Sequence, residues 1–134
     1  MWQCPACKRN FKHRNQFHMC SDVEIGELFM DKPDELVLAY DDIVQAVATW
    51  QPNSIGASLH SVVMSSQKAW LIIKPMKKVL DLKFYYGEQL DSERLKGVYR
   101  SGKKYAHHIR VSYQEELDAE VFRLLRMGFE YSLQ

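Results

Sequence analysis

Residues 69–86, A-W-L-I-I-K-P-M-K-K-V-L-D-L-K-F-Y-Y, decide the fold of this chain. The apolar run 69–74 is typical of a central β-strand, and the segment 75–78 supplies a turn after it. From residue 80 to residue 86 apolar and polar side chains alternate, which is the period of a half-buried strand. Because the connection is short, the two strands are predicted to pair antiparallel.

Two further strands are predicted on either side of this pair. Residues 58–65 form a short strand candidate, and residues 65–68 read as the hairpin turn that joins it to the central strand. Residues 105–111 alternate again, with Tyr105, His107, Ile109 and Val111 on one face. The segment 87–104, between the strand at 80–86 and the strand at 105–111, is irregular. We expect a basic loop there, with at most a helical turn near residues 91–96.

Helices are predicted before and after the strands. An oxygen cap at Asp31 and a proline at position 33 open an amphipathic stretch that ends before residue 51. Ser112 with Glu115 three residues later is a capping box, and it opens a C-terminal helix. The inward positions of the two helices recur at spacings of three and four: Leu36, Tyr40, Ile43, Val47 and Trp50 in the first, and Leu117, Val121, Leu124 and Leu125 in the second.

This order of elements predicts an α+β fold. One antiparallel sheet of about four strands is packed on one face by an N-terminal and a C-terminal helix. Ahead of it lies a small zinc finger, so the expected organisation is a finger at 1–21, an acidic connector at 22–32 and the α+β domain at 33–134.

The finger is predicted from the stretch 2–20, W-Q-C-P-A-C-K-R-N-F-K-H-R-N-Q-F-H-M-C, which holds all three cysteines. A Cys-x-x-Cys hairpin presents two thiolates to one tetrahedral ion, and such soft ligands select zinc. The fourth ligand is predicted to be His18, two residues before Cys20, and His13 is the alternative. The full predicted set is Cys4, Cys7, His18 and Cys20. A reduced Cys-x-x-Cys turn without metal, or a redox pair, is the other interpretation of these thiols.

Composition sets limits on function. The 134 residues carry a net charge of +1, so no global charge drives the chain toward nucleic acid or anionic membrane. No apolar run approaches the roughly 18 residues of a membrane span, so we expect no membrane partner. Three cysteines committed to a metal fit a reducing compartment, which predicts a cytoplasmic protein.

Several motifs together resemble a known family. They are W-x-C-P-x-C at the start, Phe11, residues 15–16, His18-x-Cys20, and the stretch 105–111 followed by an acidic helix start. The chain resembles the bacterial family called domain of unknown function 5655, whose members look like small α+β modules. The resemblance covers about residues 2–20 and 33–131. It implies that His18 and Cys20 both belong to the finger, and it brings no known reaction.

Basic residues give the main functional hypothesis. Cations interleaved with stackable rings on a flexible segment suit single-stranded nucleic acid or a phosphorylated ligand. Ordinary solvated charge is the competing interpretation. The residues predicted to contact nucleic acid or another anion are Lys8, Arg9, Lys12 and Arg14 in the finger, and Arg94, Arg100, Lys103 and Lys104 in the loop.

Other functions remain open from the sequence. The chain could be a protein-interaction module with a purely structural finger, or it could bind a small ligand in a pocket that includes His107 and Tyr105. An enzyme using His107 is less favoured than a binding module, because a histidine on an apolar strand face is more often hydrogen-bonded core. The sequence does not determine the oligomeric state.

Overall fold

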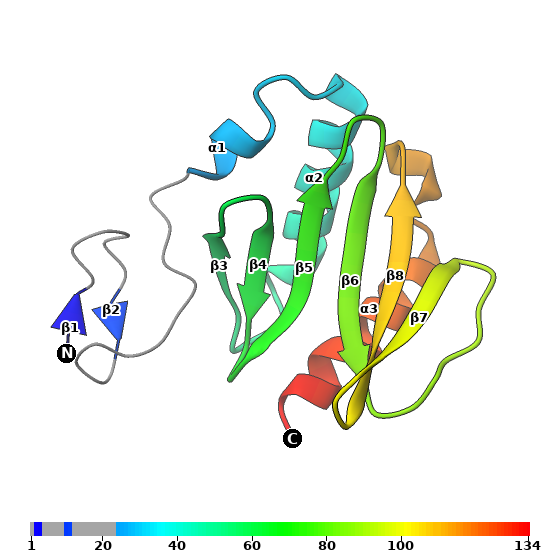
Figure 1. Cartoon of the computed structure of the whole chain (residues 1–134). Helices are drawn as coiled ribbons and strands as arrows, with labels where there is room; N and C mark the ends of the chain where they lie inside the picture. Colours follow the sequence, from blue (N-terminus) through cyan, green and yellow to red (C-terminus); the bar gives the residue numbers. More distant parts are fainter. Residues whose placement is uncertain (1, 4–9, 12–23) are drawn as a thin grey trace.

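The computed structural model of the chain describes residues 2–3, 10–11 and 24–134. Its first pair of strands, β1 (Trp2–Gln3) and β2 (Asn10–Phe11), is antiparallel and pairs Trp2 with Phe11. The rest of the described chain folds into a six-stranded sheet with helices packed against it (Figure 1). The structure is therefore α+β with one main antiparallel sheet, as predicted.

The main sheet has six strands where about four were predicted. Its order is β3-β4-β5-β6-β8-β7, and every neighbouring pair is antiparallel. The strands are β3 (Ser54–Ala57), β4 (Val62–Ser65), β5 (Ala69–Pro75), β6 (Leu80–Tyr86), β7 (Leu95–Ser101) and β8 (Lys104–Val111). The predicted pair in residues 69–86 forms the centre, with Ile73 opposite Leu82.

Both additional strands lie at the edges of the sheet. The strand predicted at 58–65 is confirmed over residues 62–65, which form β4, whereas residues 58–61 are the turn that joins β4 to the additional strand β3. The basic loop predicted at 87–104 contains β7, which pairs with β8 through a turn at Gly102, whose φ is +66°. Most of β7 is solvent-exposed, so its sequence lacks the apolar alternation that marks a half-buried strand.

The N-terminal helix of the domain is α2 (Asp34–Val47). It begins directly after Pro33, and no side chain caps it, so Asp31 does not serve as the predicted cap. Asn53 stabilises the region after its C-terminus, because its amide nitrogen donates to the Val47 carbonyl at 3.1 Å and its amide oxygen accepts from the Trp70 indole at 3.1 Å. A shorter helix, α1 (Ile25–Leu28), lies within the segment predicted as an acidic connector.

The C-terminal helix starts later than the sequence predicted. Ser112 and Glu115 do not form the capping box; instead the Ser112 amide donates to the Glu116 carboxylate at 2.6 Å. A short 3-10 helix, η1 (Gln114–Glu116), follows β8, and α3 (Ala119–Ser132) then begins behind Asp118. The Asp118 carboxylate accepts from the Val121 amide at 3.0 Å, which is a side-chain N-cap.

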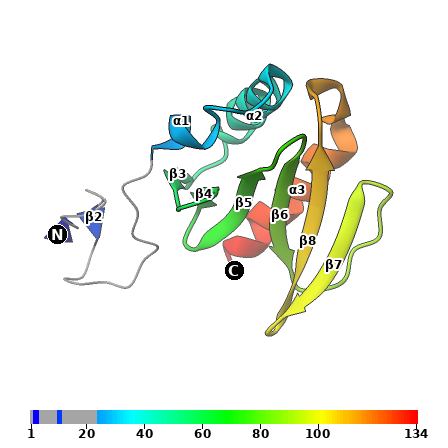
Figure 2. The ribbon, with the colours of Figure 1, turned by 45° about the horizontal axis from the view of Figure 1, so that its top comes forward.

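The two long helices, α2 and α3, cover the same face of the sheet (Figures 1 and 2). Side chains from α2, α3 and the central strands form one buried cluster that includes Leu36, Ile43, Leu82, Phe84 and Leu124. At Gly128 the α3 backbone comes so near β6 that an added Cβ would lie 2.8 Å from the Phe84 ring. The helices and strands that the structure describes leave the opposite face of the sheet uncovered.

Candidate functional site

The uncovered face of the sheet, which we call the open face, carries polar side chains in rows. Because side chains alternate along each strand, the pairing register decides which of them lie side by side. One row across β5, β6 and β8 places Asp81 between Lys74 and Arg110. The next row places Lys83 beside His108. Cations from three strands therefore surround a single carboxylate.

Asp81 is the organising group of this face. It is only 8% exposed, and its carboxylate accepts from His108 Nδ1 at 2.9 and 3.1 Å and from Arg110 Nε at 3.4 Å. A buried carboxylate needs such partners, because burial without them is unfavourable. The interaction fixes the His108 ring and leaves Nε2 without a hydrogen-bond partner among the described residues. Every buried side-chain nitrogen and oxygen of the described residues has a hydrogen-bond partner. Because Nε2 of His108 has none in that part of the chain, it is exposed to solvent.

Lysines supply the remaining charge of the open face. Lys74, Lys83, Lys96 and Lys104 form no ion pair with any carboxylate in residues 24–134. The Lys104 ammonium lies 4.1 Å from the centre of the Tyr85 ring, and that of Lys83 lies 5.8 Å from the same ring. Cation–π contact holds these two side chains close to the sheet surface while their charges remain available to an anion.

An exposed aromatic ring lies on the β7 side of the open face. Tyr99 is 63% exposed, and its ring meets the His108 ring edge to face at 5.6 Å. The ring also lies over Gly97, where a Cβ atom would come within 2.7 Å of it. Glycine at position 97 therefore leaves the space in which Tyr99 rests against the sheet.

Two shallow hollows lie on the open face, and His108 borders both. One, of about 470 Å³, is lined by the β3–β4 turn and by side chains of β5, β6 and β8, including Lys74, Lys83 and Asp81. The other, of about 630 Å³, is lined by β7, β8 and Glu116, with Lys96, Tyr99 and Arg110 among its side chains. The two hollows meet at His108, the one residue that lines both.

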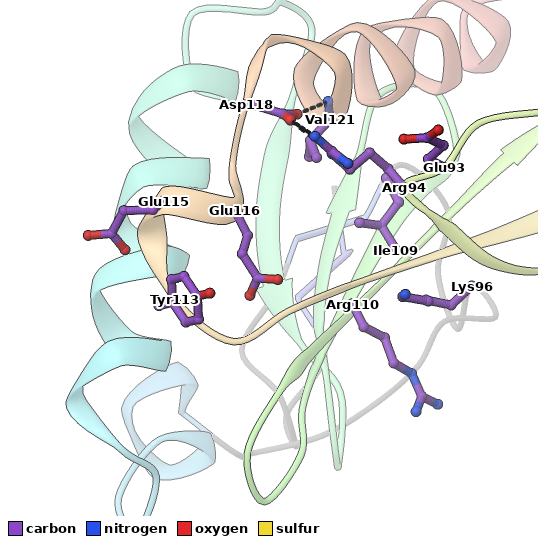
Figure 3. A pocket seen from close by; sticks show the side chains of 10 residues that line it. All are labelled: Glu93, Arg94, Lys96, Ile109, Arg110, Tyr113, Glu115, Glu116, Asp118 and Val121. Carbon is purple, nitrogen blue, oxygen red and sulfur yellow. Dashed lines mark hydrogen bonds and ion pairs between the residues drawn. The ribbon is translucent and has the colours of Figure 1, made fainter.

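A third hollow, of about 370 Å³, lies where β7, β8 and the start of α3 meet (Figure 3). The Arg94 guanidinium there donates through Nε to Asp118 at 2.8 Å and forms an ion pair with the same carboxylate. This hydrogen bond is the main cause that lowers the Asp118 pKa and raises the Arg94 pKa. Since Glu115 and Glu116 also line it, this hollow has mixed charge.

Comparison with known families decides the classification. A family model described as domain of unknown function (DUF5655) matches residues 25–132. The chain belongs to this family. Comparisons with curated proteins and with solved structures gave no match. The DUF5655 match starts at α1, within the predicted connector, and includes the whole open face.

The predicted loop cations of the DUF5655 domain do not form one surface. Arg94 is held by Asp118, as described above. Arg100 pairs with Tyr105 in the sheet register, which places it on the helix side, and its Nε donates to the Gly102 carbonyl at 3.1 Å. Lys103 lies in the β7–β8 turn, and Lys104 belongs to the open face.

Sequence reasoning did not join Lys74 and Lys83 to Asp81 and His108, and it could not establish that Asp81 and His108 meet. Asp81 and His108 are 27 positions apart, and they meet only because β6 pairs with β8 in the observed register. The signal that was available was the alternation in 80–86 and 105–111, which assigns Asp81, Lys83 and His108 to polar faces. It did not show that those faces are the same.

His107 lies on the helix side of the sheet and is fully buried. Its Nε2 accepts from the Leu90 amide at 3.0 Å, its Nδ1 lies 3.0 Å from the Tyr105 carbonyl, and its ring stacks on Phe84. Burial is the main cause that lowers the His107 pKa. This is the hydrogen-bonded core histidine favoured by the sequence, whereas a ligand-binding role of His107 and Tyr105 stays a prediction.

The predicted finger residues Cys4, Cys7, His18 and Cys20, together with His13, lie outside the described residues, as do Lys8, Arg9, Lys12 and Arg14. Within residues 2–3, 10–11 and 24–134, no group of three or more His, Cys, Asp or Glu side chains is placed to hold a metal ion. No helix in that part of the chain has the length and apolar character needed to span a membrane.

Proposed function

We propose that the domain binds single-stranded nucleic acid on the open face of its sheet. The observations that carry this proposal are that Lys74, Lys83 and Lys104 on this face form no ion pair with a carboxylate of residues 24–134, and that the exposed ring of Tyr99 lies on the same face. A lysine that is paired with a carboxylate would have to break this ion pair before it could contact a phosphate. Among the described residues, Lys74, Lys83 and Lys104 have no ion pair to break.

Single strands suit this surface better than a duplex does. Proteins that bind single strands combine a cationic track for the backbone with aromatic rings on which bases stack. On the open face Tyr99 offers such a ring, and Tyr85 lies between two lysines. The basic residues predicted in the finger, Lys8, Arg9, Lys12 and Arg14, would extend the contact.

Zinc binding by Cys4, Cys7, His18 and Cys20 is a second part of the proposal. It is supported by the thiol spacing and by the antiparallel pairing of β1 with β2, which flank residues 4–9 in the chain. A segment of about twenty residues cannot bury a core, so zinc would supply most of its folding free energy. The finger would then be a metal-stabilised unit that precedes the sheet domain in the chain.

The binding proposal is tested by fluorescence anisotropy with the full zinc-supplied chain and a labelled single strand of about 12 nucleotides. Affinity should fall steeply as salt rises from roughly 50 to 200 mM, because phosphate contacts release counterions. Tyr99→Ala should weaken binding by about 1–3 kcal/mol, the value of one stacked base.

The matched control is Tyr113→Ala, which removes another exposed tyrosine that lies beyond the end of β8. It should leave the affinity unchanged. An affinity that does not depend on salt, or an equal effect of the two substitutions, would contradict the proposal. Circular dichroism of each variant confirms that the fold is intact.

A further inference from the structure

The hollow between the β3–β4 turn and His108 is closed on one side. Its wall is the segment 58–61, in which the amide and the hydroxyl of Ser58 donate to the Ser61 carbonyl at 2.8 and 3.2 Å. Both serines are buried, at 6% and 9% exposure. This turn is therefore held in place where it borders the hollow.

The floor of the hollow carries an excess of positive charge. Lys74, Lys83, Asp81 and His108 line it. Arg110 also contacts Asp81 at 3.4 Å, so three full positive charges, Lys74, Lys83 and Arg110, lie around one carboxylate, and neither lysine forms an ion pair with a carboxylate of residues 24–134. The hollow thus presents two unmatched ammonium groups on adjacent strands, β5 and β6.

Two positive charges match a terminal phosphate monoester better than an internal phosphodiester. A phosphate monoester carries about −1.5 to −2 charges at neutral pH, whereas each internal phosphodiester of a strand carries a single charge. The monoester also has three free oxygens that can accept hydrogen bonds from both ammonium groups. Such a group occurs on a nucleic acid only at an end of the chain.

We infer that this hollow binds the terminal phosphate of a single strand, with Lys74 and Lys83 as its two cationic contacts. The inference rests on the proposed function and adds to it the recognition of a chain end. A free small phosphate would present the same chemistry, and the experiment separates it from a strand.

The test compares three otherwise identical strands, with a 5′-phosphate, a 3′-phosphate or hydroxyls at both ends, by anisotropy with the full zinc-supplied chain. One of the phosphorylated strands should bind about tenfold more tightly than the hydroxyl strand, a difference of about 1.4 kcal/mol. The double variant Lys74→Gln, Lys83→Gln should lose this preference. The control Lys77→Gln, Lys78→Gln, with the same charge change in the exposed β5–β6 turn, should keep it.

The outcomes distinguish the two proposals. Salt-sensitive binding with equal affinity for all three strands overturns the end recognition and leaves the proposed function standing. No binding of any strand overturns the proposed function. In that case a titration with inorganic phosphate, followed by amide chemical shifts, tests whether the hollow binds phosphate at all. Shifts at Lys74 and Lys83 support a phosphate site for small molecules, and the absence of shifts there overturns a phosphate site of any kind.

Discussion

Two neighbouring histidines show how different the two faces of this sheet are. His107 points into the helix-covered core, is fully buried and has both ring nitrogens engaged by the backbone. His108, the next residue, lies on the open face, where Asp81 holds one ring nitrogen and the other reaches solvent. The same side chain therefore serves packing on one face and is available for recognition on the other.

The contrast predicts that substitutions on the covered face reduce stability and that those on the open face reduce the proposed binding. On the covered face the side chains interlock, as the approach of Gly128 to Phe84 shows. On the open face the lysines contact rings and solvent and contribute little packing. Substitutions on the first face should alter stability, and those on the second should alter affinity.

The largest predicted effect separates the faces at adjacent positions of β6. Phe84→Ala should lower the free energy of unfolding by about 3–5 kcal/mol, because it removes a buried ring that packs on His107 and α3. Lys83→Ala, one residue earlier and on the other face, should change it by less than about 0.5 kcal/mol. Urea denaturation followed by circular dichroism measures both. Similar losses for the two variants would show that the faces do not differ in this way.

A smaller effect should appear as a pH dependence of stability. Burial lowers the pKa of His107, so the unfolded chain, in which the pKa is near 6.5, binds a proton more readily than the folded chain does. Stability should therefore fall as pH drops below about 6.5 toward the lower pKa of the folded state. Denaturant unfolding between about pH 7 and pH 5 should show this slope, and His107→Gln should flatten it.

This pH window separates His107 from the carboxylates that also have lowered pKa values. Glu120 has a pKa of about 2, mainly because Arg123 hydrogen-bonds to it, and its contribution is lost only as pH falls from 4.5 toward that value. An unchanged slope in His107→Gln would contradict the assignment. If that variant does not fold, the titration of the His107 ring by NMR in the wild-type chain gives the same answer.

Periodicity predicted the parts of the fold that are buried on one side. The central strands, the strand at 105–111 and both long helices have apolar positions at the expected spacing, and Leu36, Ile43, Val121 and Leu124 are fully buried. The edge strands β3 and β7 were missed because exposed strands do not need apolar alternation. Gly102, in a turn between two candidate strands, was the available signal for β7.

The candidate site could be predicted only in part. The sequence indicated that basic residues and tyrosines near 94–110 mattered, and Lys104 does lie on the open face. It could not show that Arg94 is bound by Asp118, because 24 residues separate them. It also could not bring Lys74, Lys83 and His108 together, since strand order and register depend on the whole sheet.

The central claim, that the open face is a binding surface for single strands, is tested most directly by an NMR titration of the full zinc-supplied chain with a single-stranded oligonucleotide. The account predicts that amide shifts concentrate at Lys74, Lys83, Tyr99, Lys104 and His108, with α2 and α3 little affected. Shifts confined to the two helices, or none in the sheet at saturating strand, would contradict it.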